Sequence, residues 1–152
     1  VAKFMKRHFD WETHAELCFQ DWNELNPAQK KTFTELLKKS TIVRYSRLLS
    51  AKKKDVVEFP TPTRYQKIRG EDYARVATRL VTPDNNSMFD VVFLLREKGS
   101  RWVLCDIEVE GVSKARIYRS AFKKVFAKRG IDGVVDILRR SITKHSLQKD
   151  KR

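Results

Sequence analysis

The segment Phe89–Leu95 (FDVVFLL) constrains the fold more than any other part of the chain. Its aromatic and β-branched residues, bounded by turn signals, predict a strand within Ser87–Arg96. A strand with one face in water would alternate polar and apolar residues, whereas this one is apolar on both faces. Either helices cover both faces of its sheet, or one face looks into a cavity.

Short turns predict an antiparallel sheet around this strand, because parallel neighbours need long crossover connections. The turns are Pro83-Asp84-Asn85-Asn86 and Gly99-Ser100. The other predicted extended segments are Asp55–Phe59, Arg64–Arg69, Tyr73–Val81 and Trp102–Val109.

Helices are predicted before and after the strands in the sequence. Asp10 is a good N-cap for a helix whose apolar spacing continues to Leu25. Pro27 at a first helical position begins a second helix that runs to about Ser50. Two more helices follow the sheet, starting at Ser113 and at Asp132 and separated by Gly130. We expect one α+β domain over residues 1–152, with residues 143–152 as a flexible basic tail.

The net charge of +14 is concentrated near the C-terminus. Residues 113–152 hold 13 Lys/Arg and 3 Asp/Glu, a net charge of +10. Such a field favours nucleic acid, an anionic membrane surface or an acidic protein as partner. No stretch approaches the roughly 18 apolar residues of a membrane span, so we expect a soluble protein. The chain opens on Val1 without an apolar signal region, which predicts a processed or trimmed product.

Residues that could carry chemistry are few. The three histidines and two cysteines show no metal-ligand spacing, so no metal or other cofactor is expected. Cys18 and Cys105 are expected to be buried free thiols, with one disulfide as the alternative. Asp106, Glu108 and Glu110 alternate along one strand and share a face, which would suit an acid–base pair in a pocket. We expect no enzyme, because no nucleophile or second base accompanies them.

Six short motifs, taken in order, resemble those of one known family. The N-terminal part contains His8-Phe-Asp-Trp-Glu12 and Asn26-Pro-Ala-Gln29. The last third contains Trp102-Val-Leu-Cys-Asp106, Glu110-Gly-Val-Ser113, Tyr118-Arg-Ser-Ala-Phe122 and Gly130-Ile-Asp-Gly133. In this the chain resembles the periplasmic phospholipid-binding proteins of the Mla (maintenance of lipid asymmetry) pathway, the MlaC or toluene-tolerance family.

The resemblance implies a four-stranded, curved antiparallel sheet with helices around it, similar to nuclear transport factor 2-like cones. It implies a periplasmic carrier, with phospholipid as cargo rather than cofactor. Its partners would be an outer-membrane lipoprotein complex and the lipid-domain subunit of an inner-membrane ABC transporter. We expect a monomer that does not bind nucleic acid. Two alternatives stay open: a cone-fold isomerase or dehydratase that uses Asp106 with a histidine, and a basic nucleic-acid-binding domain.

A carrier must hide acyl chains from water, at roughly 0.8 kcal/mol per buried methylene. Apolar residues on the predicted strands and helices are therefore the candidates for a cavity wall. The strand candidates are Val76, Leu80, Phe89, Val91 and Phe93, and the helix candidates are Trp22, Phe33, Leu37, Ile117 and Phe122. The resemblance also places Arg119 on the helix after Asp106, and we expect these two to form an ion pair that clamps helix to sheet.

Overall fold

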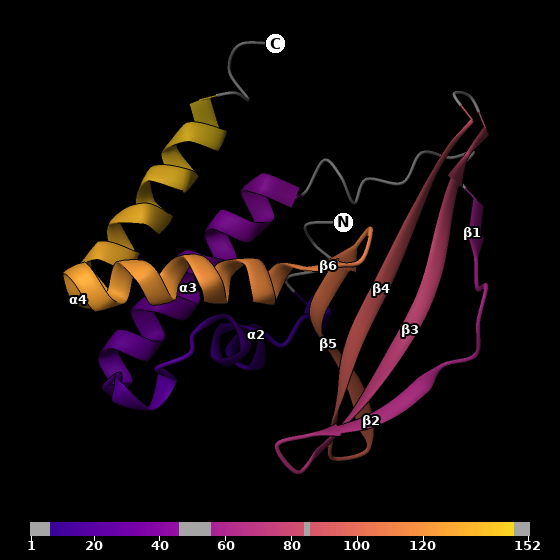
Figure 1. The fold of residues 1–152 in the computed structure, drawn as a ribbon, viewed down its shortest axis with the longest axis horizontal. Coiled ribbons are helices and arrows are strands. Elements are labelled where there is room, and N and C mark those ends of the chain that lie inside the picture. The colour runs from indigo at the N-terminus through magenta and orange to yellow at the C-terminus, as the bar shows by residue number, and fades with distance from the viewer. Residues whose placement is uncertain (1–6, 46–55, 84–85, 148–152) are drawn as a thin grey trace.

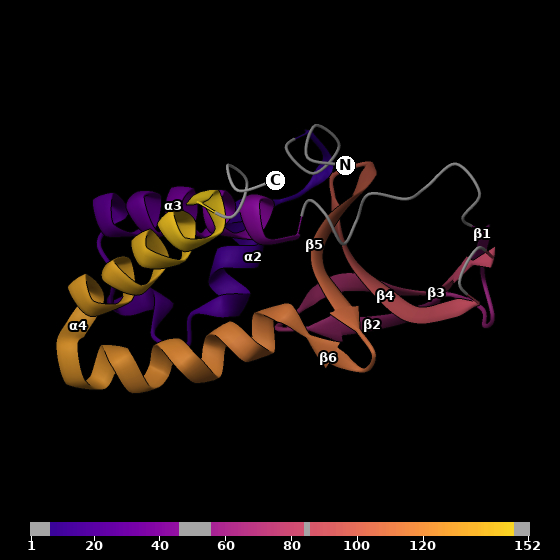
Figure 2. The same cartoon turned by 90° about the horizontal axis from the view of Figure 1, so that it is seen from above.

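The fold is an α+β arrangement with helices at both ends of the described chain, as predicted. The computed structural model describes residues 7–45, 56–83 and 86–147. Figure 1 shows the helices gathered at one end of the molecule and the strands at the other, and Figure 2 shows how strongly the sheet curves. The elements are α2 (Trp11–Cys18), the 3-10 turn η1 (Trp22–Glu24), α3 (Pro27–Tyr45), β1 (Val56–Glu58), β2 (Arg64–Ile68), β3 (Glu71–Thr82), β4 (Ser87–Lys98), β5 (Arg101–Val109), β6 (Val112–Ser113) and α4 (Lys114–Leu147).

The sheet has six strands rather than the expected four. Its order is β1-β3-β4-β5-β6, and β2 also pairs with β3; every pairing is antiparallel. The long β3 accommodates two short partners on one edge, β2 beside its first half and β1 beside its last residues. Pro60 and Pro62 separate these partners, because proline cannot donate a ladder hydrogen bond. The likeness to a nuclear transport factor 2-like cone stays a prediction.

The predicted helix starts at Asp10 and Asn26 are confirmed by their capping hydrogen bonds. The Thr13 amide donates to the Asp10 carboxylate over 3.2 Å. The Gln29 amide donates to the Asn26 side chain over 2.8 Å, and the Asn26 amide donates to the Gln29 side chain over 2.9 Å. Two reciprocal bonds of this kind form a capping box, which satisfies amides that the first helical turn leaves unpaired.

The first helix is shorter than the apolar spacing suggested. α2 ends at Cys18 because Phe19 adopts an extended backbone, and the ring of Phe19 turns into the helical core against Phe33 and Phe126. Trp22 therefore lies in the separate turn η1. The expected end of the second helix near Ser50 lies outside the described residues.

Gly130 divides α4 into two helical halves, as the sequence predicted. Its φ of 62° and ψ of −162° lie in a region that essentially only glycine adopts. Gly133 is also required, because a Cβ there would stand 2.5 Å from Cβ of Arg129. The second half continues through Leu147, so residues 143–147 of the expected tail are helical. Residues 148–152 lie outside the described chain.

Three apolar clusters hold the elements together. The largest lies between α2, α3 and both halves of α4, and includes Phe33, Leu37 and Phe122. A second lies on one face of β4 and β5, and a third lies on the opposite face, where Leu94 and Cys105 meet Leu17 of α2. Near the helices, β4 is therefore covered on both faces, which explains its two-sided apolar sequence. No helix in the described ranges is both long and apolar enough to cross a membrane.

Candidate functional site

One face of the sheet is apolar across four strands, and we call it the apolar sheet face. In the β3–β4 register, Val76 lies opposite Phe93 and Leu80 lies opposite Phe89, so these four strand candidates are neighbours on one face. Strands β1 and β5 extend the same face on either side. Its apolar members are Val57, Val76, Leu80, Phe89, Val91, Phe93, Leu95, Leu104, Ile107 and Val109.

The apolar sheet face is covered at one end and open at the other. Phe9, Trp11 and Ile42 pack over the part formed by β4 and β5. At the far end, Phe89 is 45% exposed and Val57 is 52% exposed. Exposed side chains of this size, continuous with a buried apolar cluster, mark a surface that an apolar ligand could extend over.

The polar residue Thr78 does not disrupt this face. Its hydroxyl donates to the carbonyl of Val91 over 2.8 Å, so the strand backbone satisfies its hydrogen bond. Trp11 carries the other notable polar atom, because its indole Nε1 is buried without a hydrogen-bond partner. The Thr78 hydroxyl is thus satisfied internally, whereas Trp11 Nε1 leaves one unpaired polar atom in the covered part of the face.

A β-bulge separates the apolar face from the acidic residues of β5. The register shifts between Leu94 and Leu95, which pair with Asp106 and Leu104 respectively. Cys105 is the extra residue, so Leu104 stays on the apolar sheet face while Asp106 points to the opposite side. Without the bulge, both residues would share a face.

The opposite face of the sheet carries ion pairs. Arg75 contacts Glu108 over 2.8 Å, and Arg79 contacts Asp90 over 2.8 Å. Glu110 accepts a hydrogen bond from the backbone amide of Asp90 over 2.7 Å. Glu108 and Glu110 thus have structural partners, and neither is placed to act with Asp106 as an acid–base pair.

Asp106 joins the sheet to the start of α4. It is 5% exposed, and its carboxylate accepts hydrogen bonds from the Ser113 hydroxyl at 2.6 Å and the Ala115 amide at 3.1 Å. Arg119 instead donates to the carbonyl of Leu17 over 3.5 Å. The expected Asp106–Arg119 ion pair is not among those of the described residues, although Asp106 does clamp helix to sheet through other donors.

His14 lies beside Asp106 in a closed interior. Its Nδ1 donates to the carbonyl of Cys105 over 2.7 Å and stands 3.7 Å from the Asp106 carboxylate. Its Nε2 is 3.5 Å from Sγ of Cys18 and accepts from that thiol, since Nδ1 carries the proton. Burial lowers the pKa of His14 from its ordinary value of 6.5, although Asp106 and the Cys105 carbonyl act in the other direction. His14 is therefore neutral at pH 7.

The stability of the protein is expected to fall with acid below about pH 6.5 because of His14. His14 takes up a proton at a higher pH in the unfolded chain than in the folded protein, because burial lowers its pKa only in the folded state. The contribution of neutral His14 to stability is therefore complete above the pKa of the unfolded chain and is lost as the pH falls. The free energy of unfolding should fall by up to about 1.4 kcal/mol per pH unit. Urea titrations at about pH 7.5 and 5.5 test this. The variant His14→Gln should lose this pH dependence, and the control His145→Gln, at a half-buried position on α4, should keep it. Equal dependence on pH in all three proteins would contradict the assignment to His14.

Both cysteines are free and buried, as expected. Burial raises the pKa of the Cys18 thiol and of the Cys105 thiol, so both stay protonated at neutral pH. In the ranges that the structure describes, no group of three or more His, Cys, Asp or Glu side chains is placed to hold a metal ion.

The structure separates the expected wall residues into two groups. The strand candidates share the apolar sheet face. Most helix candidates (Trp22, Phe33, Leu37 and Phe122) belong to the closed helical cluster, and Ile117 is 46% exposed on α4. The helix candidates therefore do not face the strand candidates, and a lipid-contacting role for either group stays a prediction.

Phe9, Trp11 and Ile42 cover the apolar sheet face but are not among the residues that the sequence predicted for a cavity wall. A signal was present, because Ile42 falls off the Phe33–Leu37 stripe of α3, as a helix with two covered sides requires.

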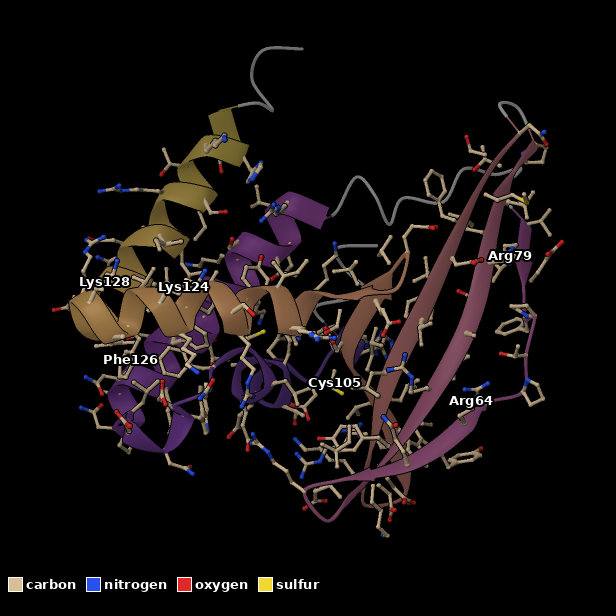
Figure 3. The ribbon with its side chains drawn as sticks, in the orientation of Figure 1. Arg64, Arg79, Cys105, Lys124, Phe126 and Lys128 are labelled. Carbon is tan, nitrogen blue, oxygen red and sulfur yellow. The ribbon has the colours of Figure 1, made fainter. Side chains whose placement is uncertain are left out.

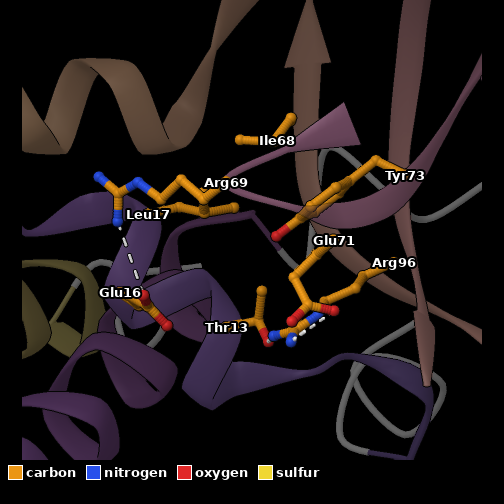
Figure 4. Close-up of a pocket in the computed structure, with 8 residues that line it drawn as sticks. All are labelled: Thr13, Glu16, Leu17, Ile68, Arg69, Glu71, Tyr73 and Arg96. Carbon is orange, nitrogen blue, oxygen red and sulfur yellow. Dashed lines mark hydrogen bonds and ion pairs between the residues drawn. The ribbon is translucent and has the colours of Figure 1, made fainter. Parts of the chain in front are cut away.

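A small polar pocket lies near the β2–β3 turn, on the side of the sheet opposite the apolar face. Its volume is about 150 Å³, and Figure 4 shows its walls, with the ion pairs Arg69–Glu16 at 3.6 Å and Arg96–Glu71 at 3.3 Å. Pockets for drug-sized ligands measure about 300–1,000 Å³. This pocket is too small and too polar for acyl chains, and neither Asp106 nor His14 lines it.

The chain is similar to known proteins in sequence and in fold. The model of a family described as MlaC protein matches residues 1–140. A solved structure of a phospholipid-binding protein from Ralstonia solanacearum, in complex with a phospholipid, is similar to this chain with a TM-score of 0.78. The two are 17% identical, over 95% of this chain and 81% of the other. At that identity the likeness shows a shared fold. No curated protein sequence matches the chain.

Proposed function

This chain belongs to the MlaC protein family, and from that premise we propose that it is a phospholipid carrier that holds acyl chains against its apolar sheet face. The observation that carries the proposal is the continuity of that face from the covered cluster around Val91 to the exposed Phe89 and Val57. The similar protein from Ralstonia solanacearum was solved with a phospholipid, which supports the same ligand class.

The physical reason is the cost of exposing acyl chains to water. Each methylene removed from water contributes about 0.8 kcal/mol, so a long apolar contact surface matters more than a few polar contacts. The apolar sheet face also gains, because Phe89 and Val57 leave water when a chain covers them. Burial of the acyl chain and burial of the apolar sheet face therefore both favour the bound state.

The alternatives fit the described residues less well. A cone-fold enzyme would need a carboxylate at the floor of a pocket, whereas both Asp106 oxygens accept internal hydrogen bonds and His14 is 1% exposed. A single-strand nucleic-acid binder would present aromatic side chains among free cations. Here Tyr73 is 4% exposed, and Arg75 and Arg79 are ion-paired.

Native mass spectrometry of protein purified from bacteria tests the proposal, and a co-purified phospholipid mass is the expected result. The variant Phe89→Ser should then weaken lipid retention by about 5- to 20-fold, since part of a Phe burial worth about 1.5–3 kcal/mol is lost. Met88→Ser is the matched control, because Met88 is 62% exposed on the other face of the same strand. Equal retention by the two variants would refute the assignment of this face. Protein that stays empty after delipidation and reloading would refute the carrier.

We further propose that the carrier works in the periplasm and exchanges lipid with an outer-membrane lipoprotein complex and an inner-membrane ABC transporter. Family membership supports this step. Transfer of labelled phospholipid between vesicles that contain the two complexes, with and without this protein, is the measurement. No acceleration of transfer by the protein would contradict the shuttle.

A further inference from the structure

Four cations on one side of α4 form a surface that the carrier role does not use. They are Arg116, Lys123, Lys124 and Lys128, and each is exposed. With 3.6 residues per turn, their positions fall within less than half of the helix circumference. Figure 3 shows Lys124 and Lys128 on one side of α4, with Phe126 on the other. We call these four residues the α4 cation patch.

The α4 cation patch gathers four cations on one side of a helix, and none of them has a counter-charge within the described residues. On the sheet, Arg75, Arg79 and Arg96 each contact a carboxylate, and later in α4 Arg129 contacts Asp136. None of the four patch residues makes an ion pair with another described residue. Residues 114–129 contain no Asp or Glu at all. The positive field of the patch is therefore not compensated by carboxylates of the described residues.

Exposed apolar side chains flank the patch at the start of α4. Ile117 is 46% exposed and lies one residue after Arg116. Val112 of β6, directly before the helix, is 47% exposed. Cations beside exposed apolar side chains on one helix face are typical of segments that lie on a membrane surface.

We propose that the α4 cation patch docks the protein on an anionic phospholipid bilayer, with Ile117 and Val112 reaching the headgroup region. Three of the four cations are lysines, whose compact, strongly hydrated charge does not require the planar pairing that arginine makes with a carboxylate. The patch spans about 18 Å of helix, which suits a continuous layer of headgroups. The proposal goes beyond the carrier function, because it concerns the membrane surface and not the bound lipid.

The expected strength of binding to an anionic bilayer follows from the number of cations in the patch. Each Lys or Arg close to an anionic leaflet strengthens binding about fivefold (about 1 kcal/mol), so four give roughly several hundred-fold at low salt. Screening reduces this at physiological ionic strength, where the Debye length is about 8 Å.

Flotation with lipid vesicles tests the proposal. We compare the full chain, the variant Arg116→Gln/Lys123→Gln/Lys124→Gln/Lys128→Gln, and a control with the same change in net charge. The control is Lys31→Gln/Lys39→Gln/Arg64→Gln/Arg101→Gln, four exposed cations on other elements. The vesicles are phosphatidylcholine alone, or with phosphatidylglycerol as about a third of the lipid.

The expected result is binding only to the phosphatidylglycerol vesicles, weakened at least about 30-fold in the patch variant and less than about 5-fold in the control. Equal weakening in both variants would overturn the proposal, because net charge alone would explain it. Unchanged binding of the patch variant would also overturn it and leave an acidic protein as the partner. Native mass spectrometry of the same proteins separates the two proposals, since loss of co-purified phospholipid from the wild-type protein would end the carrier function without affecting the flotation result.

Discussion

Replacing Phe33 by alanine is expected to lower the free energy of unfolding by about 3–5 kcal/mol. Phe33 is fully buried, and its ring meets those of Phe19, Trp22 and Phe122 at centroid distances of 5.2, 6.2 and 5.5 Å. Removing the ring leaves a cavity between α3, α4, η1 and the segment at Phe19, and these packed elements cannot close it. A domain of this size has only about 5–15 kcal/mol of stability, so the change is a large share. Urea unfolding followed by circular dichroism measures it.

Ile117→Ala is the matched control for this prediction. Both residues were candidates for a lipid-contacting wall, but Ile117 is 46% exposed, so its truncation should cost less than about 1 kcal/mol. At low temperature, the folded Phe33→Ala protein should retain phospholipid as the wild type does, because Phe33 does not lie on the apolar sheet face. If Phe33→Ala lost phospholipid but kept its stability, Phe33 would line the lipid-binding cavity, as the sequence predicted.

Replacing Asp106 by alanine is expected to cost about 3 kcal/mol of stability. The carboxylate accepts from the Ser113 hydroxyl and the Ala115 amide at the N-terminus of α4, where a negative charge also interacts favourably with the helix dipole. Its removal leaves both donors without their acceptor in a site that is almost closed to solvent. The midpoint of urea unfolding should fall accordingly.

Glu108→Gln provides the comparison on the same strand. Glu108 contacts Arg75 at a partly exposed position, so its neutralisation should cost less than about 1 kcal/mol. A structural role also predicts that Asp106→Asn, which keeps one acceptor, costs less than Asp106→Ala. An enzymatic role would instead appear as a loss of turnover in Asp106→Asn with stability unchanged.

The sheet was the part of the fold that the sequence predicted best. The two-sided apolar segment at Phe89–Leu95 required cover on both faces, and β4 has that cover near the helices. Short turns gave the antiparallel order of the long strands. The alternation of Val76 and Leu80 against Phe89 and Phe93 gave one face of the candidate site, because residue alternation fixes the face once the register is known.

The helical part of the candidate site was not predictable in the same way. Periodicity identified Phe33 and Leu37 as buried, but it does not reveal what a buried helix face packs against. The structure places both in the cluster formed with α2 and the two halves of α4 rather than against the sheet. The partners of Asp106 depend on the bulge at Cys105, and a single inserted residue leaves no distinct signal in the apolar pattern.

The closed helical cluster also determines when this protein can finish folding. Phe33 and Leu37 share it with Val134 and Leu138, which follow them by about a hundred residues, with the entire sheet between. Contacts so distant along the chain carry a large loop-closure entropy and form late. The cluster around α2 and α3 therefore stays incomplete until the second half of α4 has been synthesised, although residues of both helices already have partners on β4 and β5.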